Sequence, residues 1–74
     1  MDQLMDILRE LNPDIDFDTE DDLVDGGILD SFDIITLVGE INDAFGVEIG
    51  PLDLVPENFN SAGDIRALIR RLQD

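Results

Sequence analysis

The longest amphipathic run in this sequence covers residues 31–46, and it restricts the fold more than any other stretch. Its apolar residues recur at intervals of three and four, which is the spacing of an α-helix that buries one face. Phe32 and Ile35 fall away from that face, where they are either ordinary exposed residues or anchors for a partner. The run therefore predicts a long helix that ends at Gly46. The core-facing residues are expected to be Ile34, Leu37, Val38, Ile41, Ala44 and Phe45.

Apolar stripes at helical spacing also occur near both ends of the chain. The first lies in residues 2–11 and ends before Pro13, because the residue before a proline is pushed away from helical angles. The last lies in residues 61–72 and begins at Ser61, which forms a capping-box pattern with Asp64. Each stripe predicts a helix with one face in the core.

The remaining sequence is consistent with a small all-α fold. Residues 56–60 begin with proline, which suits the first position of a short helical turn. Residues 47–49 alternate like a strand but have no second strand to pair with, so we expect an extended connection. We predict a single domain spanning 1–74, a four-helix bundle of three long helices and one short helical turn, with a long loop between helices 1 and 2. The expected helices cover 2–11, 31–46, 56–60 and 61–72. The residues expected to close one end of the core are Leu52, Leu54, Val55 and Phe59.

The connection between the first two helices, 13–30, is strongly acidic. Counted from Asp14, every ligand position of an EF-hand loop is an acid. However, the sixth position of such a loop needs glycine and is Thr19 here, and the last ligand is Asp25 instead of the longer glutamate. A true EF-hand is therefore disfavoured and no metal site is assigned, while weak binding of divalent cations stays open. The residues expected to anchor this loop on the core are Ile15, Phe17, Leu23 and Val24.

Composition excludes several classes of function. The net charge of −15 repels nucleic acid and anionic membranes, and it favours a monomer that meets basic surfaces on other proteins. The chain has no Cys, His, Lys, Tyr or Trp, so an enzyme would have only carboxylates for acid–base chemistry. No run reaches the roughly 18 apolar residues of a membrane span, and the first residues are not basic like a signal peptide. We therefore expect a cytoplasmic protein that is not an enzyme.

Ser31 stands where the acidic loop passes into the long helix, between Asp30 and Phe32. A serine at this point can cap the helix with its hydroxyl. It is also expected to be exposed, to sit on a rigid element, and to lie near N–H groups that favour an added phosphate. Gly27, the Asp30-Ser31-Phe32 motif, the long helix that follows, the small size and the acidity together resemble the acyl carrier protein family.

This resemblance covers nearly the whole chain and implies a carrier function. In that family, the serine of an Asp-Ser-hydrophobic motif bears a 4′-phosphopantetheine arm donated by coenzyme A, and the arm holds the cargo as a thioester. The resemblance implies that Ser31 is the attachment site and that Asp30 belongs to the motif read by the phosphopantetheinyl transferase. It also implies a face of the second helix read by partner enzymes, consisting of Phe32, Asp33, Ile35, Thr36 and Asp43.

Within the family, residues 27–32 and 55–60 look most like D-alanyl and other aminoacyl carrier proteins. The implied partners are the transferase, an adenylating ligase or an acyltransferase, and a downstream acyl-accepting enzyme. Many fatty-acid carriers have an acid where Thr36 stands and a larger residue at Gly39, which disfavours fatty-acid partners. A fatty-acid or polyketide carrier is the alternative within the family. Outside it, the alternative is an acidic module that binds divalent cations or acts as an adaptor, without a prosthetic group.

Overall fold

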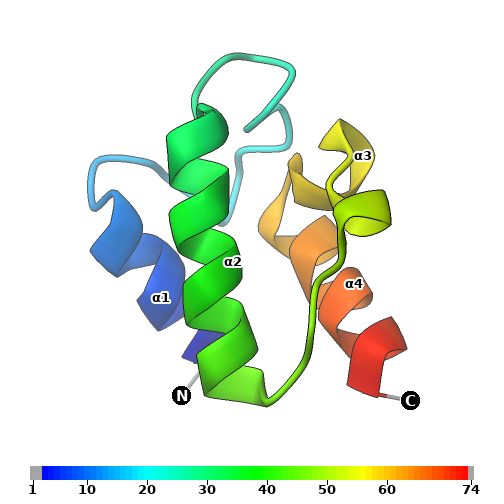
Figure 1. Ribbon diagram of the computed structural model, residues 1–74. Coiled ribbons are helices and arrows are strands. Elements are labelled where there is room, and N and C mark those ends of the chain that lie inside the picture. The colour runs from blue at the N-terminus through cyan, green and yellow to red at the C-terminus, as the bar shows by residue number, and fades with distance from the viewer. Residues whose placement is uncertain (1–2, 74) are drawn as a thin grey trace.

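The computed structural model describes residues 3–73, and in this range the chain is built from helices and connections without a strand (Figure 1). This confirms the predicted all-α class, and residues 47–49 form the extended connection that was expected. The elements in chain order are α1 (Gln3–Leu11), α2 (Ser31–Phe45), the 3₁₀ turn η1 (Pro51–Asp53), α3 (Pro56–Phe59) and α4 (Ala62–Gln73).

The observed helix bounds differ from the expected ones by one residue at several ends. Asp2, the expected first residue of the first helix, lies outside the described residues. Ser61 precedes α4 as its cap, because its Oγ accepts a hydrogen bond from the N–H of Asp64 at 3.0 Å. Gly46 ends α2 with a φ of 63°, a left-handed conformation that glycine adopts without a steric penalty.

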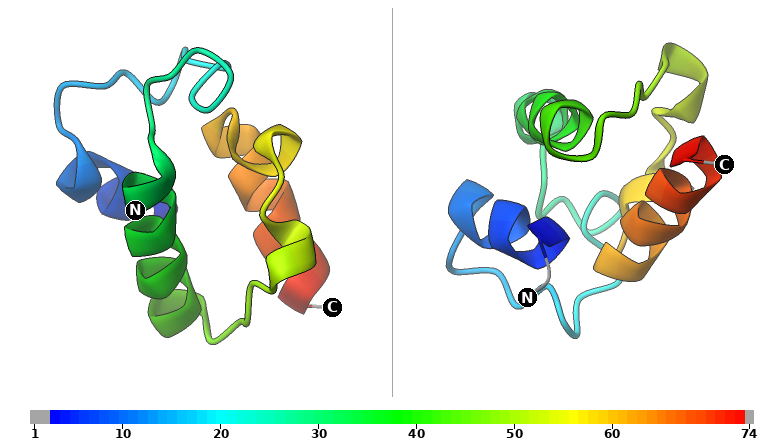
Figure 2. Two further views of the ribbon diagram at one scale, coloured as in Figure 1. Left: turned by 45° about the horizontal axis from the view of Figure 1, so that its top comes forward. Right: turned by 90° about the horizontal axis from the view of Figure 1, so that it is seen from below.

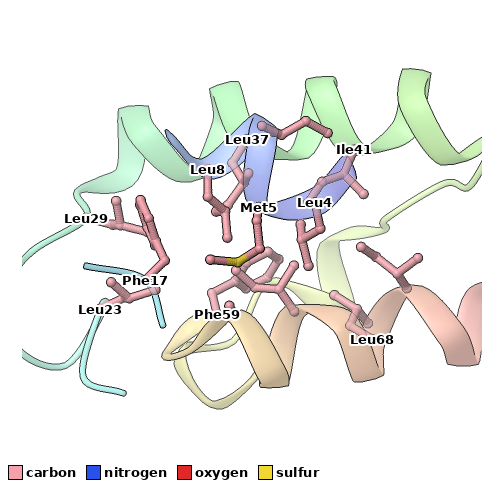
Figure 3. Close-up of a cluster of buried hydrophobic side chains, with 14 of the residues drawn as sticks. Leu4, Met5, Leu8, Phe17, Leu23, Leu29, Leu37, Ile41, Phe59 and Leu68 are labelled. Atoms are coloured by element: carbon pink, nitrogen blue, oxygen red, sulfur yellow. The ribbon is translucent and has the colours of Figure 1, made fainter. Parts of the chain in front are cut away.

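The helices pack around one interior. α1 contacts α2 and α4, and α3 contacts α4. Figure 2 shows α1, α2 and α4 around this interior, with the long connection between α1 and α2 crossing one end of it. Figure 3 shows side chains from the four helices and from the connection meeting in one apolar cluster. The buried residues of the cluster are Leu4, Met5, Ile7, Leu8, Phe17, Leu23, Leu29, Leu37, Ile41, Ile49, Phe59, Ala62, Ile65, Leu68 and Ile69.

The predicted core face of α2 is confirmed. Leu37 and Ile41 are completely buried, and the other four residues assigned to this face are half-buried against the cluster. The predicted anchors of the acidic connection are also confirmed, because Phe17 and Leu23 are buried and Ile15 and Val24 are half-buried. The connection is therefore held on the core although it has no helix of its own.

The prediction that Leu52 and Leu54 close the core is wrong. Leu52 is 93% exposed and Leu54 is 44% exposed, while Phe59 is buried and Val55 is half-buried. The cause is η1, in which the N–H of Asp53 donates to the carbonyl of Gly50 at 3.0 Å. This tight turn leaves Leu52 in solvent, and Leu54, the residue after the turn, is only partly covered.

Candidate functional site

Ser31 is the first residue of α2, and the cap of this helix is Asp30. Asp30 has an extended backbone, and its Oδ1 accepts a hydrogen bond from the N–H of Asp33 at 2.8 Å. In return, the N–H of Asp30 donates to Oδ2 of Asp33 at 3.3 Å. The prediction that Ser31 caps the helix is therefore wrong by one residue. The cap is complete without the Ser31 hydroxyl, and Ser31 is exposed.

The capping role of Asp30 can be tested by substitution. Asp30→Ala is expected to cost about 1 kcal/mol of folding free energy, which lowers the melting temperature by about 4–8 °C in a domain of this size. Asp30→Asn is expected to melt like the wild type, because asparagine caps equally well. Thermal unfolding followed by circular dichroism measures both. If Asp30→Asn melts as low as Asp30→Ala, the capping assignment is contradicted.

A groove of about 470 Å³ opens beside Ser31. Figure 1 shows that the start of α2 and α3 lie at the same end of the molecule, and residues of both line the groove. Ile34 and Ile35 line it from α2, and Val24 and Leu29 line it from the connection. The facing wall consists of Leu54, Val55, Pro56 and Phe59. An exposed hydroxyl at the edge of an apolar groove, on a rigid helix, suits a long arm that carries a cargo.

The face assigned to partner enzymes is divided in the structure. Phe32 is 75% exposed and lies, with Thr36 and Asp43, on the side of α2 opposite the core. Ile35 is 67% exposed and also lines the groove. Asp33 is half-buried and bonded to Asp30, so its first role is in the cap. Asp43 is twelve residues from Ser31, which corresponds to about 18 Å along the helix. The structure thus gathers Asp30, Ser31 and Ile35 at the groove and places Asp43 well away from it.

Sequence reasoning missed Asn60, which follows α3. Its Oδ1 accepts hydrogen bonds from the N–H groups of Val24 and Asp25, at 3.1 and 3.0 Å. Its Nδ2 donates to Oδ2 of Asp25 at 3.0 Å, and its carbonyl accepts from the N–H of Leu23 at 2.9 Å. These bonds join the acidic connection to the end of α3. Nothing in the local sequence indicates them, because the partners lie 35 or more residues away.

The acidic connection forms no recognisable metal centre. Within residues 3–73, no group of three or more metal-ligating side chains is arranged to hold an ion. Nη2 of Arg9, in α1, lies 4.0 Å from Oδ2 of Asp18 in the connection, and both side chains are largely exposed. No helix within this range is long and apolar enough to cross a membrane.

Comparison with known proteins agrees with this site. The family model described as "Phosphopantetheine attachment site" matches residues 2–72. The D-alanyl carrier protein of Lactococcus lactis subsp. lactis (strain IL1403) is 32% identical, in an alignment that covers 97% of this chain and 94% of that protein. The D-alanyl carrier protein of Lactococcus lactis subsp. cremoris (strain MG1363) is similar to the same extent. No solved structure matches the chain.

These similarities settle the kind of protein. Carriers of this kind work with a phosphopantetheinyl transferase and with ligases or acyltransferases, and they are not enzymes themselves. The exposed serine and the apolar groove fit the prosthetic group that the family bears. The chain belongs to the phosphopantetheine attachment site family, as an acyl or aminoacyl carrier whose cargo is held on a 4′-phosphopantetheine arm.

Proposed function

We propose that Ser31 is the attachment residue for the arm and that the cargo is D-alanyl or a related aminoacyl group. The observation that carries the first part is the placement of an exposed Ser31 hydroxyl at the start of α2, beside the apolar groove. The second part is supported by the similarity to D-alanyl carrier proteins over nearly the full length of the chain.

The residues around Ser31 affect the addition of the phosphate in two opposite ways, through the start of α2 and through two neighbouring acids. The Ser31 oxygen forms a bond to the phosphorus of the pantetheine phosphate in coenzyme A, the bond to adenosine 3′,5′-bisphosphate breaks, and the transferase takes the hydroxyl proton. The first N–H groups of α2 and the positive end of its dipole favour the phosphate that results. Asp30 and Asp33 add negative charge next to it, so the transferase must supply cations that offset this charge. Once attached, the arm supplies the thiol that carries the cargo.

The proposal extends to the partners of the chain. Asp30 belongs to the motif that the transferase reads, and Phe32, Asp33, Ile35, Thr36 and Asp43 belong to the face read by partner enzymes. These partners are an adenylating ligase or acyltransferase and a downstream acyl-accepting enzyme. The net charge of −15 supports brief, fast docking to basic enzyme surfaces by a monomeric carrier, without nucleic acid as a partner. Because modification needs coenzyme A, the proposal includes a cytoplasmic location.

The cargo is tested by offering the modified protein two loading systems in parallel reactions. The carrier bearing its arm is incubated with ATP and either a D-alanine-activating ligase or a fatty-acid-activating ligase, each with its own substrate. Intact mass spectrometry then measures the added acyl group, and hydroxylamine treatment tests the thioester. We expect loading with D-alanine and its release by hydroxylamine. Loading with fatty acid alone would instead identify a fatty-acid carrier and contradict the aminoacyl assignment.

A further inference from the structure

Asn60 forms the most extensive long-range polar link within the described part of the chain. Its amide group bonds to the backbone of Val24 and to the backbone and side chain of Asp25, and its carbonyl bonds to the backbone of Leu23. Three consecutive residues of the connection are thus tied to one residue at the end of α3. A hydrogen-bonded amide of this kind specifies one arrangement of two segments, because each bond has a defined direction.

The link continues from Asn60 to Ser31. The N–H of Leu29 donates to the carbonyl of Leu23 at 2.8 Å, which closes the loop that leads into α2. Val24 and Leu29 also form one wall of the groove, while Phe59, the residue before Asn60, belongs to the facing wall. Asn60 therefore joins the two walls at the end of the molecule where Ser31 lies.

We infer that Asn60 is a positioning residue for the modification of Ser31. By holding the connection against the end of α3, it fixes the width of the groove and the direction in which the chain enters α2. Its hydrogen bonds are to Leu23, Val24 and Asp25 and not to Ser31, so its effect passes through the connection and Leu29. This inference rests on the proposed attachment at Ser31.

The test compares Asn60→Ala with a matched control in the same region. Asn60→Ala removes three side-chain hydrogen bonds. Asn58→Ala removes two, one donated by Nδ2 to the carbonyl of Asp53 at 2.9 Å and one accepted by Oδ1 from Nη2 of Arg71 at 3.1 Å. Neither partner of Asn58 belongs to the connection before Ser31. The steady-state rate of phosphopantetheine transfer from coenzyme A is measured at a temperature where circular dichroism shows both variants fully folded. We expect Asn60→Ala to lose about 10- to 100-fold in kcat/KM, mainly in kcat. Asn58→Ala is expected to match the wild type.

Exchanging the side chains at positions 25 and 60 tests the hydrogen bond that Nδ2 of Asn60 donates to Oδ2 of Asp25. Asn60→Asp places two carboxylates where Nδ2 now donates to Oδ2 at 3.0 Å, so it is expected to impair transfer. Asp25→Asn alone is expected to be silent, because its amide oxygen still accepts from Asn60. The double variant Asn60→Asp with Asp25→Asn restores a donor facing a carboxylate and keeps the net charge at −15. It is expected to recover most of the wild-type rate.

The outcomes separate this inference from the proposed function. A wild-type protein that no transferase modifies would refute the attachment at Ser31 itself. With an active wild type, an unchanged kcat/KM in Asn60→Ala would overturn the positioning role, and so would an equal loss in Asn58→Ala. Failure of the double variant to recover activity would also count against it. Amide exchange provides a second measurement, because the N–H groups of Val24, Asp25 and Leu29 should exchange faster in Asn60→Ala than in Asn58→Ala.

Discussion

Replacing Ser31 with alanine is expected to abolish attachment of the arm while leaving the fold intact. No other side chain can take over at this position, because the residues on either side are Asp30 and Phe32. The helix cap does not depend on the serine, since Oδ1 of Asp30 accepts from the N–H of Asp33 at 2.8 Å. Alanine is also a better helix former than serine at an exposed helical position.

Intact mass and thermal unfolding measure the two halves of this prediction. After incubation with coenzyme A, Mg²⁺ and a broad-specificity transferase, the wild type should gain one phosphopantetheine and Ser31→Ala should gain none. The melting temperature of Ser31→Ala should stay within a few degrees of that of the wild type, whereas the melting temperature of Asp30→Ala should fall by about 4–8 °C. A large loss of stability in Ser31→Ala would mean that the serine has a structural role that the observed cap does not explain.

The second large effect is a loss of stability, expected when a buried leucine on the core face of α2 is shortened. Leu37 is completely buried between α2 and the rest of the cluster, so Leu37→Ala should cost about 2–5 kcal/mol of folding free energy. Small domains have total stabilities near the low end of about 5–15 kcal/mol. The variant is therefore expected to melt at least about 10 °C lower and to be partly unfolded at assay temperature.

Leu52→Ala is the matched control, because the same atoms are removed from a side chain that is 93% exposed. Its free energy of unfolding should change by less than about 0.5 kcal/mol. Urea unfolding followed by circular dichroism measures both variants. Equal losses for Leu37→Ala and Leu52→Ala would contradict the burial pattern. A weak effect of Leu37→Ala alone would show that α2 is not fixed by its core face.

The helices could be predicted because the sequence patterns that specify a helix and its ends lie within a few residues of one another. The apolar residues of α2 and α4 repeat at helical spacing, and Pro13, Gly46 and Ser61 mark helix ends through backbone rules that act within a few residues. The start of α2 shows the limit of this reasoning. Asp30 and Ser31 are both good capping residues, and the choice between them depends on which backbone is extended. The signal that identifies Asp30 as the cap is Asp33, the acid three residues later, which completes a capping box.

The parts that could not be predicted depend on geometry beyond the local sequence. Leu52 and Leu54 are as apolar as the residues of the core, so the sequence does not mark them as exposed. Their exposure follows from the tight 3₁₀ turn in the path between α2 and α3. The groove beside Ser31 brings together residues from Val24 to Phe59, so no single motif encodes it. Asn60 looks like an ordinary polar residue between two helices until its partners in the connection are seen. The exposed side of α2 was predicted, because helical spacing alone places Phe32 and Ile35 away from the core.

The claim that Ser31 carries the arm is tested most directly by locating the arm on the modified wild-type protein with peptide mass spectrometry. The chain has four hydroxyl side chains that could compete for the group, at Thr19, Ser31, Thr36 and Ser61. Proteolysis followed by fragmentation of the modified peptide assigns the phosphodiester to one of them. The structure predicts complete modification at Ser31 and none at the other three. Attachment at any other hydroxyl, or no attachment with several transferases, would contradict the account.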